Sequence, residues 1–101
     1  MNVPGSWFEF NLSIRTGQPF ILRLVETYDH AQVKDYEVLV NGTVVHHRVM
    51  NKADGGLETY QFVVDDPALL NSSSVRIRIQ HNATASGYDP SLADAWSLPL
   101  P

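Results

Sequence analysis

The sequence predicts an all-β fold, an antiparallel β-sandwich of about seven to eight strands with jelly-roll or immunoglobulin-like connectivity. Apolar residues recur at every second position, which is the period of a strand and not of a helix. Short strand-like segments alternate at regular spacing with turn-rich joints such as RTGQP and NSSS. A chain of 101 residues is long enough for one core, so we expect residues 1–101 to form a single domain.

The first two strands are predicted in residues 7–14 and 19–28. The segment WFEFNLSI alternates between apolar and polar positions, so one of its faces lies on the core. Its apolar positions are Phe8, Phe10, Leu12 and Ile14. The segment PFILRLVETY is apolar on both faces, with Phe20, Leu22 and Leu24 opposite Ile21 and Val25. Apolar residues on both faces are typical of a central strand that is covered on both sides.

Residues 36–49, YEVLVNGTVVHHRV, predict a β-hairpin. Asn41 and Gly42 favour a type I′ turn, in which both central residues need positive φ. Such a turn fixes the register of the two strands outward from its ends. The expected cross-strand pairs are Val40–Thr43, Leu39–Val44, Val38–Val45, Glu37–His46, Tyr36–His47 and Asp35–Arg48.

Three further strands follow the hairpin. Residues 59–64 and 75–80 alternate between apolar and polar positions, and LADAWSL at 92–98 fits a short closing strand with Trp96 in the core. Only DDPALL favours helix, where Asp66 suits the N-cap and Pro67 the first helical position. We expect a single turn there.

The composition excludes several classes of protein. The chain has no cysteine, which excludes disulfide frameworks, thiolate zinc sites and cysteine nucleophiles. Its net charge is −4 and it has no basic stripe, so neither nucleic acid nor a membrane is an expected partner. The MNVPGSW start lacks the charged and apolar regions of a signal peptide. We therefore expect a domain excised from a larger protein.

No pattern in the sequence predicts catalysis or a cofactor. The four histidines show no metal-ligand spacing, and the adjacent His46 and His47 must point to opposite faces of a strand. The ASGYD stretch lacks the strand–turn–helix context of a nucleophile elbow. Carboxylates in YDH, VDD and GYDPS leave a structural calcium ion open, but none has the spacing of a calcium loop. We predict a domain that is not an enzyme.

Four of the six asparagines lie in N-x-S/T sequons, more than this composition gives by chance. Two are expected on the outward side of strands, one in a loop and one at the hairpin tip, where a glycan would not disturb the core. The alternative is that Asn and Ser simply favour turns. If the sequons are used, the protein is a secreted glycoprotein. They begin at Asn11, Asn41, Asn71 and Asn82.

Two segments place an aromatic ring next to polar side chains where strands are predicted to end. Tyr88 and Asp89 lie in the TASGYDPS loop, and Tyr28, Asp29 and His30 lie where the second strand ends. Exposed rings stack on the apolar faces of sugars, while carboxylates bond the hydroxyl groups. We predict a carbohydrate site there if both segments meet at one end of the sandwich. The alternative for Tyr88 is a loop anchor packed on its own sheet.

Trp7 is expected on the outward face of its strand, opposite to Phe8, and is a further candidate ligand contact. An acidic domain repels polyanions, so a neutral or mildly basic polysaccharide is the expected ligand.

Residues 20–45 and 75–100 together resemble the accessory β-sandwich domains of secreted glycoside hydrolases. The resemblance rests on a strand that ends in VNG, a VRI strand after it, a loop with Gly87 and a closing strand. It is nearest to the galactose-binding-like C-terminal sandwich of β-L-arabinofuranosidase-type enzymes. The resemblance implies a non-catalytic accessory domain that binds carbohydrate and neighbours a catalytic domain in the parent chain.

Two other functions stay open at this point. A structural sandwich that packs on a neighbouring catalytic domain would carry an exposed apolar patch on one sheet face. An adhesion-type domain that binds protein would have immunoglobulin connectivity.

Overall fold

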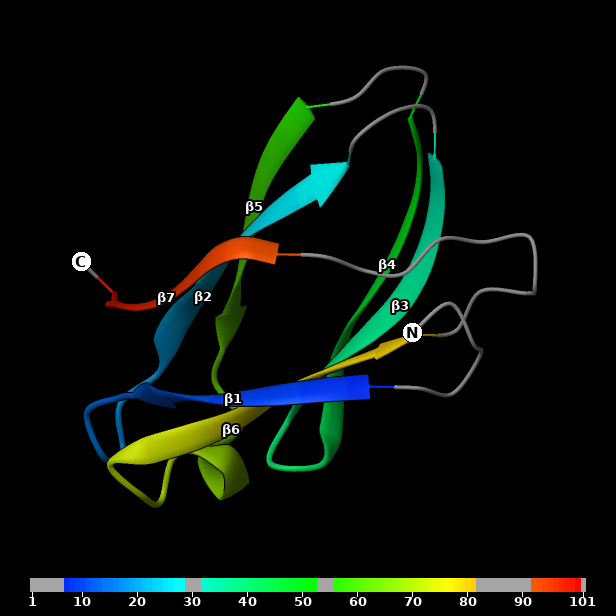
Figure 1. Ribbon diagram of the computed structural model, residues 1–101. Helices are drawn as coiled ribbons and strands as arrows, with labels where there is room; N and C mark the ends of the chain where they lie inside the picture. Colours follow the sequence, from blue (N-terminus) through cyan, green and yellow to red (C-terminus); the bar gives the residue numbers. More distant parts are fainter. Residues whose placement is uncertain (1–6, 29–31, 53–55, 82–91, 101) are drawn as a thin grey trace.

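The computed structural model describes residues 7–28, 32–52, 56–81 and 92–100, which form seven strands and one short 3₁₀ turn, η1 (Figure 1). The predicted all-β fold is confirmed. The elements are β1 (Trp7–Ser13), β2 (Phe20–Tyr28), β3 (Gln32–Val40), β4 (Thr43–Lys52), β5 (Gly56–Val64), η1 (Pro67–Leu69), β6 (Ser74–His81) and β7 (Leu92–Pro99).

The strands form two antiparallel sheets packed as a sandwich (Figure 1). Sheet A has the order β1-β6-β3-β4, and sheet B has the order β5-β2-β7. Seven strands with immunoglobulin connectivity would instead give β1-β2-β5-β4 and β7-β6-β3. The marker of an adhesion-type domain is therefore missing from the described strands.

The core lies between the two sheets and consists mainly of alternate residues from their central strands. Phe20, Leu22 and Leu24 of β2 face Val38 and Val40 of β3, and each is at most 3% exposed. The period-2 alternation of the sequence produces this layer directly, because successive side chains of a strand point to opposite faces. The remaining buried apolar residues are Tyr36, Val64, Leu69, Leu70, Val75, Ile77 and Ile79.

The hairpin turn between β3 and β4 is confirmed. Asn41 and Gly42 both have positive φ, at 50° and 88°, as a type I′ turn requires. Asn41 also joins the tip to β6, because its backbone N–H donates to the Arg76 carbonyl and its Oδ1 accepts from the Arg76 N–H, both at 2.9 Å.

The predicted register of the hairpin is wrong beyond its first two pairs. Val40 pairs with Thr43 and Leu39 with Val44, but the pairing then shifts by one residue at a β-bulge. Val45 is the extra residue, because Val38 pairs with His46. The pairs that follow are Glu37–His47, Tyr36–Arg48 and Asp35–Val49. The bulge therefore turns His46 and Arg48 toward the interior.

Two further predictions about packing are wrong. Ile21 and Val25 on the outer face of β2 are only partly buried, because no second layer covers sheet B in the described structure. Trp96 is 40% exposed and does not belong to the core. It pairs with Arg23 on the outward face of sheet B.

The single helical turn is confirmed as η1, with the Asp66 side chain accepting from the Ala68 N–H at 3.0 Å.

The two ends of the sandwich differ. At one end, β2, β4 and β6 finish and β1, β3, β5 and β7 begin, and we call it the polar end. At the other end lie the turn after β1, the hairpin tip and η1 (Figure 1). The candidate site described below lies at the polar end.

Candidate functional site

Next to the polar end, the apolar core gives way to a layer of polar side chains between the sheets. The strand registers produce this layer. Tyr36 pairs with His81 on one side and with Arg48 on the other, while Glu26 pairs with Glu58 in the opposite sheet. The hydroxyl of Tyr60 reaches it from the adjacent row of β5. We call this group the polar layer, and its members are Glu26, Tyr36, Arg48, Glu58, Tyr60 and His81.

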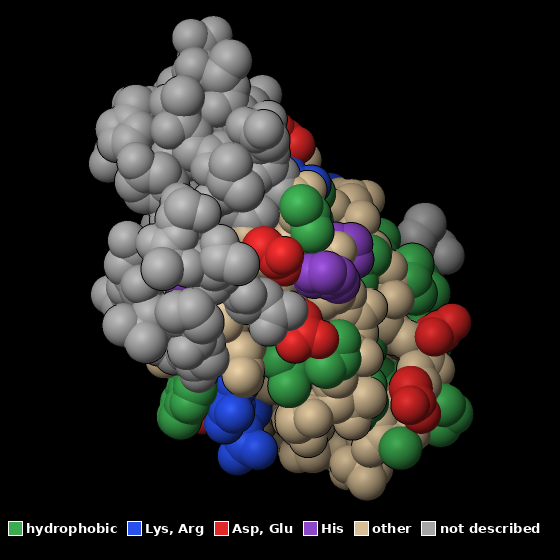
Figure 2. All heavy atoms as spheres, turned by 90° about the vertical axis from the view of Figure 1, so that its right-hand side faces the viewer, with side chains coloured by type: hydrophobic (Ala, Val, Ile, Leu, Met, Phe, Trp, Pro, Cys, Tyr) green, Lys and Arg blue, Asp and Glu red, His purple; other side chains and the backbone are tan. Residues whose placement is uncertain are grey.

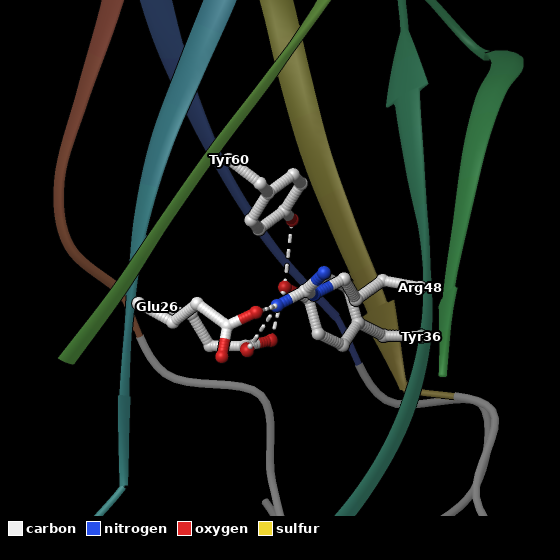
Figure 3. Close-up of polar contacts among 5 residues, drawn as sticks. Glu26, Tyr36, Arg48 and Tyr60 are labelled. Carbon is white, nitrogen blue, oxygen red and sulfur yellow. Dashed lines mark hydrogen bonds and ion pairs between the residues drawn. The ribbon is translucent and has the colours of Figure 1, made fainter. Parts of the chain in front are cut away.

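Hydrogen bonds join the two sheets through the polar layer (Figure 3). The Tyr36 hydroxyl donates to Glu26 Oε2 at 2.6 Å, and its oxygen lies 2.7 Å from the Tyr60 hydroxyl. Since Tyr36 has one proton and gives it to the carboxylate, Tyr60 is the donor to Tyr36. The chain of donors therefore runs from Tyr60 through Tyr36 to Glu26, and both Tyr36 and Glu26 are completely buried.

Arg48 bridges two carboxylates of sheet B. Its Nη2 lies 3.1 Å from Glu26 Oε1 and 2.7 Å from Glu58 Oε1, and its guanidinium carbon lies 4.2 Å from the centroid of the Tyr60 ring. Burial by itself lowers the pKa of Arg48, but the hydrogen bonds to Glu26 and Glu58 raise it more, so the guanidinium stays charged. Solvent does not reach the Glu26 side of this bridge but does reach the Glu58 side, where the Glu58 side chain is 38% exposed.

The titration of the aromatic groups follows from their burial. Burial raises the pKa of Tyr60 to about 12 and moves the pKa of Tyr36 further above its ordinary value. Burial, together with the nearby charge of Arg48, lowers the pKa of His46 below its ordinary value. The neutral His46 ring stacks on Phe62, with 4.6 Å between the ring centroids.

Some buried polar atoms of this layer have no hydrogen-bond partner among the described residues. They are Nε of Arg48 and both ring nitrogens of His81, which is completely buried. Buried polar groups in folded proteins almost always have a partner, so these atoms are positions where a water molecule or a ligand group would be stabilised.

Most of the residues predicted to bind a ligand lie outside the described part of the chain. Asp29, His30, Tyr88 and Asp89 belong to this group, and Tyr28 is the last residue of β2. The described strands show only where these segments begin. β2 and β6, which lead into the segments 29–31 and 82–91, both finish at the polar end.

Trp7, the remaining predicted contact, begins β1 near the same end but points outward from sheet A. Its side chain is 48% exposed. The guanidinium of Arg78 lies over the ring at 4.0 Å and also bonds Glu9 at 2.9 Å. Trp7 is therefore separated from the polar layer by the thickness of the sheet.

The outer face of sheet A carries a second polar cluster around β3 and β4. His47 Nε2 lies 2.6 Å from Asp35 Oδ1, and Glu37 pairs with His47 in the register. Figure 2 looks onto this side of the molecule and shows histidine side chains bordered by acidic and hydrophobic ones. Within the described residues, no group of three or more His, Cys, Asp or Glu side chains is arranged to hold a metal ion.

The sequon positions are consistent with solvent access where the structure describes them. Asn11, Asn41 and Asn71 are exposed, and Asn82 lies outside the described residues. None of the described helical segments has the length and apolar character needed to span a membrane.

Comparison with known proteins finds a similarity to a solved structure. No protein-family model and no curated protein matches the sequence. A solved structure described as a family 35 carbohydrate-binding module from an environmental isolate has a TM-score of 0.67 to this chain. The likeness is one of fold. It covers 98% of this chain and 73% of that one at 14% sequence identity.

Sequence reasoning missed Glu26, Arg48 and His81 as members of the site. Glu26 continues the inward series of Phe20, Leu22 and Leu24, and His81 continues that of Val75, Ile77 and Ile79, so parity alone would have placed both inside. No such signal existed for Arg48, because its inward direction depends on the bulge at Val45.

Proposed function

We propose that this chain is a non-catalytic domain that binds a neutral or mildly basic carbohydrate at the polar end of the sandwich. The observation that carries the proposal is the convergence at that end. β2, which ends at Tyr28 and precedes Asp29 and His30, and β6, which precedes the segment with Tyr88 and Asp89, both finish there, next to a polar layer with unpartnered buried nitrogens. The similarity of fold to a carbohydrate-binding module supports it further.

The charge of the site favours such a ligand. The polar layer holds two carboxylates and one guanidinium, and Arg48 is already engaged by both carboxylates. The layer therefore has no excess of positive charge to bind an acidic sugar, and the net charge of −4 repels polyanions at low salt. In the parent protein, we place the domain beside the catalytic domain of a secreted glycoside hydrolase.

An NMR titration of the ¹⁵N-labelled domain tests the proposal. Oligosaccharides of arabinan, galactan, xylan and mannan are added to millimolar concentration, because one or two stacked rings give only a few kcal/mol before ordering costs. We expect saturable shifts around Tyr88 and Tyr28 with at least one sugar, and their loss in Tyr88→Ala. Thr43→Ala, at the opposite end, is the control and should bind normally. If none of the sugars produces shifts, the proposal is refuted.

A further inference from the structure

The outer face of sheet B carries a row of side chains that the polar end does not use. Gln61 of β5, Arg23 of β2 and Trp96 of β7 are direct partners across all three strands, so they point outward side by side. Trp96 is 40% exposed on the edge strand. Arg23 Nε donates to Gln61 Oε1 at 2.8 Å, which ties the guanidinium to its neighbour in the row.

This row has the chemistry of a sugar-contacting surface. The indole of Trp96 offers an apolar ring face, and the terminal guanidinium nitrogens of Arg23 and the amide nitrogen of Gln61 offer donors to hydroxyl groups. Asp94 lies in the neighbouring row, two residues along β7, and adds a carboxylate acceptor. Arg23 and Asp94 offset each other in charge, which suits a neutral ligand at this part of the face.

An open groove lies beside the part of β7 that is farthest from the polar end. Leu98 follows Trp96 on the same outward face and also lines an open groove of about 310 Å³ beside the turn after β1. Its polar lining comes from Ser13, Arg15, Gln18 and Ser97. A volume near 300 Å³ is at the lower limit for small-molecule sites, so it would hold one or two sugar units.

The same face carries apolar side chains, which is the marker expected for packing on another domain. Val63 and Leu57 are 50% and 67% exposed, and Ile21, Val25 and Leu98 are partly exposed. The area argues against a protein partner. Three strands spaced about 4.8 Å apart and eight residues long present about 400 Å², roughly half of what each partner buries in a standard interface.

We propose that Trp96, Arg23 and Gln61 form a second carbohydrate-binding surface, which takes a neutral, extended glycan lying along β7 from Trp96 to the groove. This inference rests on the proposed function, since it assigns a further contact surface to the same class of ligand. It differs in place, because sheet B presents this face away from the polar layer.

The test uses the same ¹⁵N-labelled domain with hexasaccharides of xylan, mannan, galactan and arabinan. We expect a second set of saturable shifts at Arg23, Gln61 and the Trp96 indole N–H. Trp96→Ala should weaken this set at least fivefold and leave the shifts at the polar end unchanged. If Trp96→Ala folds poorly, Arg23→Met replaces it as the test variant. Arg23→Met keeps the apolar stem of the side chain and should also weaken this second set of shifts. Val44→Ala, exposed on sheet A, is the matched control.

The outcomes separate the two proposals. Shifts at the polar end alone overturn this inference and leave the proposed function standing. Shifts at Trp96 alone, lost in Trp96→Ala, support the inference and refute the site at the polar end. If no sugar moves the Trp96 set and sedimentation shows self-association that Trp96→Ala abolishes, the face is a protein-docking surface and the inference is wrong.

Discussion

The substitution Glu26→Gln tests whether the polar layer stabilises the sandwich. The substitution keeps the shape of the side chain but removes its negative charge. In the native protein, Glu26 Oε1 lies 3.1 Å from Arg48 Nη2 and Oε2 accepts a hydrogen bond from the Tyr36 hydroxyl. Removing one partner of a buried ion pair costs about 3–5 kcal/mol when the other charge is left alone. Arg48 keeps Glu58 at 2.7 Å, so we expect a smaller loss, about 2–3 kcal/mol. For a domain of this size that lowers Tm by about 10–20 °C.

The matched control is Glu58→Gln, which removes the other carboxylate that Arg48 contacts. The Glu58 side chain is 38% exposed, so its ion pair is screened by water and should contribute about 1 kcal/mol or less. Urea unfolding followed by tryptophan fluorescence measures both variants. A double-mutant cycle with Arg48→Met should show coupling to Glu26 above about 1 kcal/mol. Equal losses for Glu26→Gln and Glu58→Gln would refute the argument that burial determines the energy.

Three further predictions concern the turn, the pH dependence and the sequons. Gly42→Val forces a β-branched residue to a φ of 88° and should cost about 1–3 kcal/mol, whereas Gly42→Asn should cost less; an unchanged Tm in Gly42→Val would contradict the turn assignment. The raised pKa of Tyr60 favours the protonated phenol in the folded state, so this contribution to stability is complete below about pH 10 and is lost as the pH rises toward 12. Urea unfolding between pH 8 and 11.5 should therefore show a free energy of unfolding that falls as the pH rises, and the fall should be shallower in Tyr60→Phe. The same pH dependence in both proteins would contradict this role of Tyr60. Mass spectrometry of protein secreted from a eukaryotic host should find glycans on Asn11 and Asn71, and unmodified peptides would contradict the secreted glycoprotein hypothesis.

The sequence predicted the fold because strand alternation and turn chemistry are local properties. Asn41–Gly42 identified the hairpin, and the alternation in residues 75–79 identified a central strand of sheet A. The register failed at Val45, since nothing in TVVHHRV distinguishes a bulged strand from a regular one. Trp96 was misplaced for a related reason. In LADAWSL, the bulge at Ala93 decides which face is buried, and the described residues place no second layer over the outer face of sheet B; neither feature is visible in a single sequence.

The candidate site was predicted less completely than the fold. Alternation would have placed Glu26 and His81 inside, but the hydrogen-bonded chain from Tyr60 to Glu26 needs two sheets in contact, which is a long-range property. The shared end of β2 and β6 likewise follows from strand order rather than from any motif. Physical chemistry thus identified candidate residue types, while topology decided which of them meet.

The two bulges have a consequence for how copies of this molecule behave at high concentration. Val45 interrupts β4 and Ala93 interrupts β7, and each of these strands lies at the edge of its sheet. An edge strand offers unpaired N–H and C=O groups to any passing strand, and a bulge breaks their regular spacing and increases the local twist. The irregularity that turns Arg48 inward therefore also makes β4 a poor template for another chain. The buried ion pair and the protection of this edge against pairing with another chain thus depend on the same inserted residue.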